Sequence, residues 1–192
     1  GVSDIAVVVG HRSEQIEEFV EDADLDLTIV DNDDYDGGNA LSVFSAREFV
    51  ANEPFVVCMG DHAISRRIVR TLLSEDWEGC VLCVDRDASL APSQVSDATK
   101  VQVDGDGYIS AIGKNLRYWD AIDTGVFMMN GDVFDAVDTL TRQNGTDVTI
   151  SQVVTSFGHS GDPFATCDVS GMFWADVDTY DDYTSVDAML SE

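Results

Sequence analysis

The sequence predicts an α/β protein with a mixed, mainly parallel sheet. Short apolar runs alternate with amphipathic stretches in the first half, a hairpin pattern follows, and 44% of the 192 residues are hydrophobic. Strands alternating with helices form βαβ units, whose right-handed crossovers make neighbouring strands parallel. The length fits one domain over residues 1–192 with a substantial core.

In the first half of the chain, the sequence pattern predicts four strands with helices between them. In the last helix of this half, Ile68 and Leu72 are four residues apart, as are Val69 and Leu73, which marks one apolar face. Ser13 is a plausible N-cap for the first helix. The predicted strands are 4–10, 26–30, 55–60 and 80–85, and the predicted helices are 13–22, 39–50 and 65–76.

The second half begins with a hairpin. Residues 99–113 alternate with period two on either side of Asp104-Gly105-Asp106-Gly107, which is a turn sequence. A buried strand at 121–129 and a helix at 132–140 follow. Segment 164–179 predicts two short strands, and a closing helix starts near residue 180 with Thr179 as its cap. Residues 87–97 are expected to form a loop.

The charge balance restricts the classes of partner. The chain has 37 acidic residues and 10 Lys plus Arg, so its net charge is −27. Such a field repels nucleic-acid phosphates and anionic membranes, so neither is an expected partner. Spread acid with an ordinary core is typical of adaptation to high salt, which predicts a halophilic, archaeal source.

Neither membrane insertion nor secretion is indicated. No apolar run reaches the roughly 20 residues needed to span a bilayer, and no basic segment followed by an apolar stretch marks a signal peptide. The four cysteines lie in apolar runs, and Cys80-x-x-Cys83 has no second pair to complete a zinc site, so buried, reduced thiols are expected. These features predict a cytoplasmic protein.

Acidic residues at strand ends are the main candidates for chemistry. Asp61 follows the strand 55–60, Asp123 lies within "AIDTG", and Asp176 and Asp178 lie in "FWADVDT". Mg²⁺ prefers one or two carboxylates plus substrate phosphates, which suits phosphoryl or nucleotidyl transfer. In a chain this acidic, the same pattern also arises by chance. No phosphate-binding P-loop and no nucleophile elbow is present.

The two lysines, Lys100 and Lys114, flank the predicted hairpin. In a chain with so few lysines, ammonium groups on either side of one hairpin are candidates for neutralising substrate phosphates. The alternative is that both are ordinary surface residues paired with nearby acids.

Taken in order, seven segments resemble the sugar-phosphate nucleotidyltransferases, in particular the archaeal CTP:inositol-1-phosphate cytidylyltransferase branch. The resemblance covers nearly the whole chain. The segments are "VVVGHRSEQIEEF", "NDDYDGGNALSVFSAREFV", "FVVCMGDH", "VLCVDRD", "DATKVQVDGDGYISAIGK", "YWDAIDTGVFMM" and "FWADVDTYDD".

The resemblance implies a Rossmann-like, three-layer α/β fold and a reaction that joins a nucleoside triphosphate, CTP favoured, to a phosphorylated polyol or sugar, releasing pyrophosphate. It implies that Mg²⁺ is the cofactor. It also implies a role for each matched residue: Asp61 and Asp176 as metal ligands with Asp178 weaker, Gly38 and Asn39 along the base, Gly60 leaving room for the nucleotide, Lys100 and Lys114 near the acceptor phosphate, and Asp123 and Thr124 facing the acceptor.

One departure from the family pattern affects the expected activity. The family begins with a strand and a glycine-rich loop that holds the triphosphate, and this chain has neither, so we expect an N-terminally truncated fold with little or no activity alone. The alternative is a non-catalytic relative that binds a nucleotide or a partner, with unpaired sheet surface favouring a homodimer. A phosphatase ranks last, because its D-x-D-x-[TV] motif belongs after the first strand.

Overall fold

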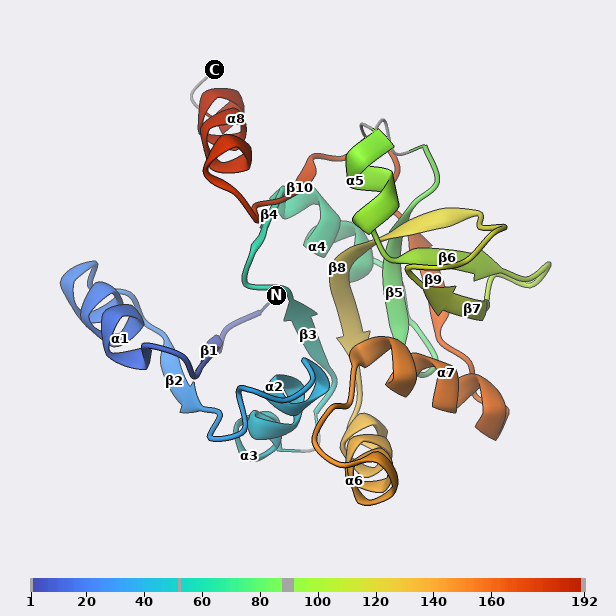
Figure 1. Cartoon of the computed structure of the whole chain (residues 1–192), viewed down its shortest axis with the longest axis horizontal. Coiled ribbons are helices and arrows are strands. Elements are labelled where there is room, and N and C mark those ends of the chain that lie inside the picture. The colour runs from blue at the N-terminus through green and yellow to red at the C-terminus, as the bar shows by residue number, and fades with distance from the viewer. Residues whose placement is uncertain (1, 52, 88–91, 191–192) are drawn as a thin grey trace. The chain divides into compact units, whose positions relative to one another are not determined.

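A computed structural model describes residues 2–51, 53–87 and 92–190, which form two compact units. Unit 1 contains residues 1–55 and 130–157, and unit 2 contains residues 56–129 and 158–192. Figure 1 shows the elements of both. The expectation of a single domain stays a prediction.

Unit 1 combines a two-stranded sheet with helices. Strands β1 (Ala6–Val9) and β2 (Thr28–Asp31) pair in parallel, with α1 (Ser13–Asp22) between them in the chain. Strand β1 is only partly buried, although its sequence is a run of apolar residues. Ser13, the predicted N-cap, is instead the first residue of α1 and follows Arg12, which is in the left-handed conformation. The other helices are α2 (Ala40–Ser45), α3 (Arg47–Val50), α6 (Asp132–Asn144) and most of α7 (Ile150–Ser160).

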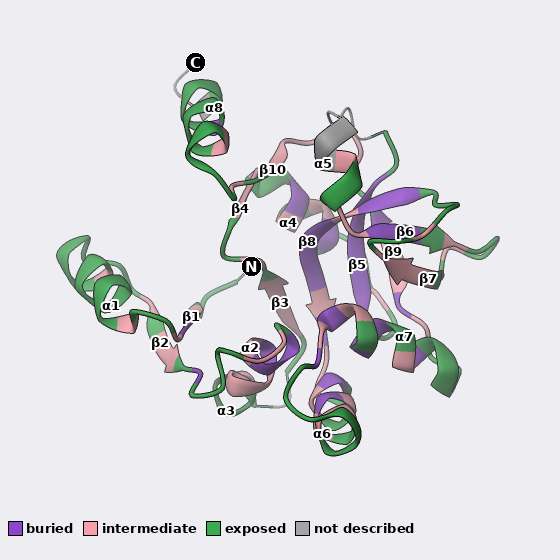
Figure 2. Ribbon diagram, in the orientation of Figure 1, coloured by how far each residue is buried: buried purple, intermediate pink, exposed green. Residues whose placement is uncertain are grey.

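Unit 2 is built on the main sheet. Strand order is β7 (Ile109–Gly113), β6 (Lys100–Val103), β8 (Ala121–Met129), β5 (Val81–Asp85) and β9 (Ala165–Asp168), and β3 (Phe55–Cys58) also pairs with β8. The central strands β5 and β8 are largely buried, as Figure 2 shows. On one face, α4 (Arg66–Leu72) contributes Ile68 and Leu72 to a core that includes Val81, Val126 and Val169.

The sheet is mixed, as predicted, but the expectation that it is mainly parallel does not hold around β8. This strand runs antiparallel to both β5 and β6, whereas β5 and β9 are parallel. The reason is that the hairpin turn reverses the chain between β6 and β7, and β8 then runs in the same direction as β7 on the other side of β6. The hairpin turn itself is confirmed: Asp104 Oδ1 accepts hydrogen bonds from the amides of Asp106 and Tyr108.

Several elements differ from the sequence-based expectation. Strand β4 (His62–Ile64) and helix α7 were not predicted, and α5 (Pro92–Asp97) lies in the expected loop, of which residues 88–91 are outside the described residues. Thr179 is confirmed as the cap of α8 (Tyr180–Leu190): its Oγ1 accepts from the Asp182 amide, and its own amide donates to Asp182 Oδ2. Cys80, Cys83 and Cys167 are buried outside any disulfide, as expected, but Cys58 is exposed.

No helix within the described residues combines the length and the apolar character needed to cross a bilayer.

Candidate active site

The candidate site is organised by a short antiparallel ribbon between β4 and β10 (Trp174–Asp176). In its register, Asp176 pairs with His62 and Trp174 pairs with Ile64. The Val177 amide extends the ribbon by donating to the Asp61 carbonyl oxygen at 2.9 Å. This pairing brings Asp61 and Asp176 together although they are far apart in the sequence.

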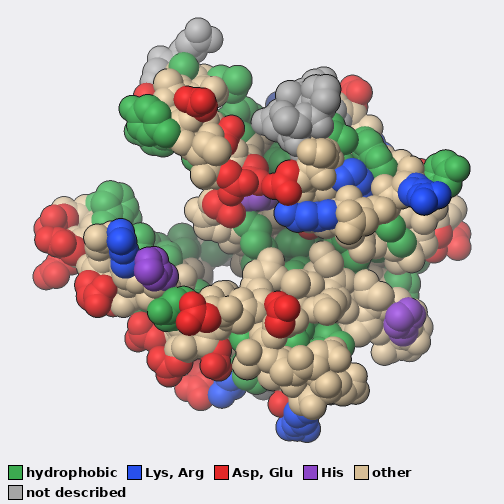
Figure 3. Space-filling view, in the orientation of Figure 1, with side chains coloured by type: hydrophobic (Ala, Val, Ile, Leu, Met, Phe, Trp, Pro, Cys, Tyr) green, Lys and Arg blue, Asp and Glu red, His purple; other side chains and the backbone are tan. Residues whose placement is uncertain are grey.

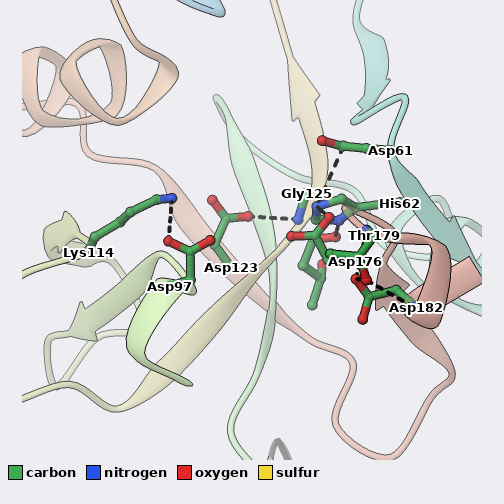
Figure 4. Close-up of polar contacts among 10 residues, drawn as sticks. Asp61, His62, Asp97, Lys114, Asp123, Gly125, Asp176, Thr179 and Asp182 are labelled. Atoms are coloured by element: carbon green, nitrogen blue, oxygen red, sulfur yellow. Dashed lines mark hydrogen bonds and ion pairs between the residues drawn. The ribbon is translucent and has the colours of Figure 1, made fainter. Parts of the chain in front are cut away.

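Asp61, His62 and Asp176 form a compact cluster of potential ligands. One ligand atom from each lies within 4.8 Å of the other two, and His62 Nε2 is 3.8 Å from Oδ1 of each aspartate. Figure 4 shows the three side chains converging, and Figure 3 shows acidic groups gathered in this region of unit 2. The aspartates are about half exposed, whereas the His62 side chain is only 13% exposed.

The His62 ring is held on several sides. Its Nδ1 donates to the Thr124 carbonyl oxygen at 2.9 Å. Gly125, at φ +73°, lies so close that a Cβ there would be 2.5 Å from Nδ1, so only glycine leaves room for the ring. The Trp174 ring is roughly parallel to the imidazole, with centroids 6.2 Å apart, and its Nε1 donates to Asp85 Oδ2.

The cluster raises the pKa of the Asp176 carboxyl group. Burial is the main cause, the nearby His62 opposes it, and repulsion from Asp178 and Asp61 adds to it. A divalent cation would relieve this repulsion. The donor set also fits such an ion, because ligand atoms bonded at about 2.1 Å lie roughly 3 to 4 Å apart around it.

Asp178 is exposed and is not one of the three residues whose ligand atoms gather. Its negative charge contributes to the raised pKa of Asp176. Gly60 precedes the cluster, and a Cβ added there would meet no atom within 4 Å, so space is open beside it.

Asp123 and Thr124 lie within β8, where the register with β5 shifts, and they behave differently. Thr124 is fully buried, and its Oγ1 donates to the Cys83 carbonyl oxygen at 2.8 Å, so its side chain does not face a substrate as expected. Asp123 is partly buried and accepts from the Gly125 amide. Burial raises the pKa of Asp123 to about 6, although the Gly125 hydrogen bond and the charge of His62 act to lower it.

The two lysines have separate environments. Lys100 is buried, and its Nζ donates to the carbonyl oxygens of Ala98 at 3.1 Å and Lys114 at 2.8 Å, with a longer contact to Ser96. Its ammonium group therefore holds backbone in this structure and is not free to bind a phosphate. Lys114 is exposed and forms an ion pair with Asp97 at 3.2 Å, which Figure 4 shows.

Gly38 and Asn39 have structural contacts within unit 1. A Cβ on Gly38 would lie 2.1 Å from the Val148 carbonyl oxygen, so this glycine allows two backbone segments to touch. Asn39 Oδ1 accepts from the Ile150 amide at 2.9 Å, at the first residue of α7. These contacts account for both residue types without a nucleotide base.

The sequence interpretation missed His62, Gly125 and Trp174 as parts of the site. His62 had a usable signal, because it directly follows Asp61, the acid that comes after a predicted strand. Gly125 and Trp174 had none, because their contacts depend on how β4, β8 and β10 are arranged in space.

Comparisons with known proteins identify relatives along nearly the whole chain. No family model matches it. The bifunctional IPC transferase and DIPP synthase of Rubrobacter xylanophilus is 32% identical over 188 residues, and its namesake from Thermococcus kodakarensis is 32% identical over 191. The alignments cover 97% and 99% of this chain but 41% of each relative, so the chain spans about two fifths of the length of these curated relatives.

A solved structure agrees with these relatives. The inositol-1-phosphate CTP transferase from T. maritima superimposes with a TM-score of 0.85 at 25% identity, covering 100% of this chain and 77% of that one. These relatives and this structure support the nucleotidyltransferase family as the one that the chain resembles. A UDP-glucose pyrophosphorylase complexed with UDP-glucose shares the fold, with a TM-score of 0.76 at 12% identity over 98% of this chain and 81% of that one.

These similarities confirm the resemblance inferred from the ordered motifs and the Rossmann-like α/β class. The residue roles that the resemblance implied remain predictions, and the geometry above separates those that converge from those that do not.

Proposed function

We propose that this chain is the transferase region of an enzyme that joins CTP to a phosphorylated polyol or sugar and releases pyrophosphate. One observation carries the proposal: Asp61 and Asp176 converge beside His62 in the nucleotidyltransferase fold. The T. maritima inositol-1-phosphate CTP transferase supports CTP and inositol-1-phosphate as the first substrates to test.

Asp61 and Asp176 would hold a Mg²⁺ ion, since two carboxylates plus substrate phosphates are the ligands this ion prefers. When bound, the ion withdraws charge from the phosphates. Gly60 presents no side chain beside the cluster, which leaves space for the triphosphate.

In the reaction, an oxygen of the acceptor phosphate forms a bond to the α-phosphorus of CTP. The bond from that phosphorus to the bridging oxygen of the β-phosphate breaks, and pyrophosphate leaves with the electron pair. No covalent enzyme intermediate is needed.

Lys114 is the better candidate for neutralising the acceptor phosphate. Its exposed ion pair with Asp97 is weak, typically below about 1 kcal/mol, so a phosphate can displace the carboxylate. Lys100 instead holds the backbone of Lys114 in place, because its ammonium group donates a hydrogen bond to the Lys114 carbonyl oxygen. We therefore assign Lys100 a positioning role in place of the direct one expected from the sequence.

Pyrophosphate release from CTP with a panel of polyol and sugar phosphates, with and without Mg²⁺, tests the reaction. Asp61→Asn and Asp176→Asn should abolish it, whereas Asp106→Asn removes the same charge from an exposed turn and should not.

Binding of CTP by this chain should be measured separately by calorimetry. Little or no turnover is the expectation stated above for this chain alone, and it stays a prediction. CTP binding that is independent of both aspartates, without turnover on any acceptor, would favour the non-catalytic relative.

A further inference from the structure

His62 points one ring nitrogen at the two carboxylates, and its hydrogen bond defines the state of that nitrogen. Nδ1 lies 2.9 Å from the Thr124 carbonyl oxygen, which can only accept, so Nδ1 carries a hydrogen. In a neutral imidazole, Nε2 therefore has a free lone pair. It lies 3.8 Å from Oδ1 of both Asp61 and Asp176, beyond hydrogen-bond distance.

Neighbouring residues hold the ring in this orientation. Gly125 leaves space for it, and Trp174 lies roughly parallel to it, with its own indole nitrogen bound to the buried Asp85. A histidine that binds a metal through one nitrogen usually donates the other N–H to a carboxylate or a backbone carbonyl. His62 has this arrangement.

We infer that His62 Nε2 is the third protein ligand of the divalent cation at Asp61 and Asp176, and that it biases the site toward transition metals such as Mn²⁺ and Co²⁺ over Mg²⁺. Mg²⁺ takes oxygen ligands, whereas an imidazole nitrogen strengthens binding of transition metals. The inference rests on the proposed function, because it requires a cation between the two carboxylates.

The test uses Mn²⁺ alone with the whole chain, in concentrated KCl to suppress weak binding by the net charge of −27. Pulsed electron paramagnetic resonance detects nitrogen bound to Mn²⁺, and ¹⁵N-histidine labelling identifies its source. We expect a ¹⁴N coupling in the unlabelled protein that changes to a ¹⁵N coupling on labelling. This result comes from the unmutated protein, so it does not depend on how any variant folds.

His62→Gln should remove the coupling and lower Mn²⁺ affinity about tenfold or more. Mg²⁺ affinity should fall less, so the ratio of the two affinities changes, which a general loss of structure would not produce. His159→Gln is the matched control, because His159 is exposed near the end of α7, and it should behave like the unmutated protein.

Two other results have distinct meanings. If Mn²⁺ binding depends on Asp61 and Asp176 but shows no histidine coupling, the inference is overturned and the proposed function stands. If Asp61→Asn and Asp176→Asn leave Mn²⁺ binding unchanged, the cation is not held here, and both the inference and the proposed metal site fail.

Discussion

The imidazole of His62 is hydrogen-bonded to the backbone carbonyl of Thr124, 62 positions later in the chain, at 2.9 Å. The contact ties β4 to β8 beside Gly125. The candidate site therefore depends on the backbone of β8, while the Thr124 side chain is turned to Cys83 and stabilises the sheet.

Gly125→Ala should destabilise unit 2 and displace His62. The new Cβ would be 2.5 Å from Nδ1, and φ is +73°, so steric overlap adds to backbone strain of about 1–3 kcal/mol. Gly107→Ala is the control, because it introduces backbone strain without steric overlap: φ is +91°, and the added Cβ would meet no atom within 4 Å. Urea unfolding should show the larger loss for Gly125→Ala, and equal losses would contradict the predicted overlap.

Asp123→Asn should stabilise the protein above pH 7 but not near pH 3.5. Burial raises the pKa of this carboxyl from 3.8 to about 6 in the folded state, so the stability that it contributes is fully present below 3.8 and is lost as pH rises through about 6. Ionised Asp123 then costs up to about 3 kcal/mol, which the amide avoids while still accepting from the Gly125 amide.

The measurement for Asp123→Asn is the free energy of unfolding in urea at both pH values. Asp106→Asn, in an exposed turn, should show little dependence on pH. A gain for Asp123→Asn that is the same at pH 3.5 and pH 7.5 would argue against the raised pKa.

Lys100→Met should lower the free energy of unfolding by about 2–3 kcal/mol. The buried ammonium binds two backbone carbonyl oxygens closely, and its loss leaves them without this donor. Lys114→Met removes the same charge from an exposed ion pair and should cost less than about 1 kcal/mol. Similar losses in urea unfolding would show that Lys100 has no special structural role.

The same pair of variants separates structure from catalysis. If Lys114 binds the acceptor phosphate, Lys114→Met should raise the KM for the acceptor while the fold is intact. An unchanged KM would remove Lys114 from the proposed reaction.

Thermal stability should increase with KCl. The net charge of −27 causes self-repulsion, and the Debye length falls from about 10 Å at 0.1 M to about 3 Å at 1 M salt. Acidic side chains are spread over the face of the molecule in Figure 3. Melting in KCl should be compared with melting in sucrose, which does not screen charge. A melting temperature that is independent of KCl would contradict the interpretation of the charge as adaptation to salt.

Sequence patterns predicted the α/β class and the hairpin, because these follow from the alternation of strands with helices and from a turn sequence. The pairing of Asp61 with Asp176 was implied by the family resemblance, because acids at strand ends are too common in this chain to single out two of them. Sequence patterns did not predict β4, whose three residues are too few to show a period. Helix α7 was missed although Ile150, Val153, Val154 and Phe157 have helical spacing.

Side-chain direction was the least predictable property of the site. The motif match assigned Lys100, Thr124 and Asn39 to substrates, yet each binds backbone carbonyl or amide groups in the structure. A motif records which residue stands at a position, but the neighbouring backbone decides whether its polar atoms remain available.

The β4–β10 ribbon has a consequence for biosynthesis. When the ribosome has synthesised the chain as far as β9, every strand of the main sheet is present. The nascent chain still lacks Asp176, so the two carboxylates cannot yet come together. The two carboxylates can therefore come together only after β10 has been synthesised, and any ion that they hold, as proposed above, would bind after that point.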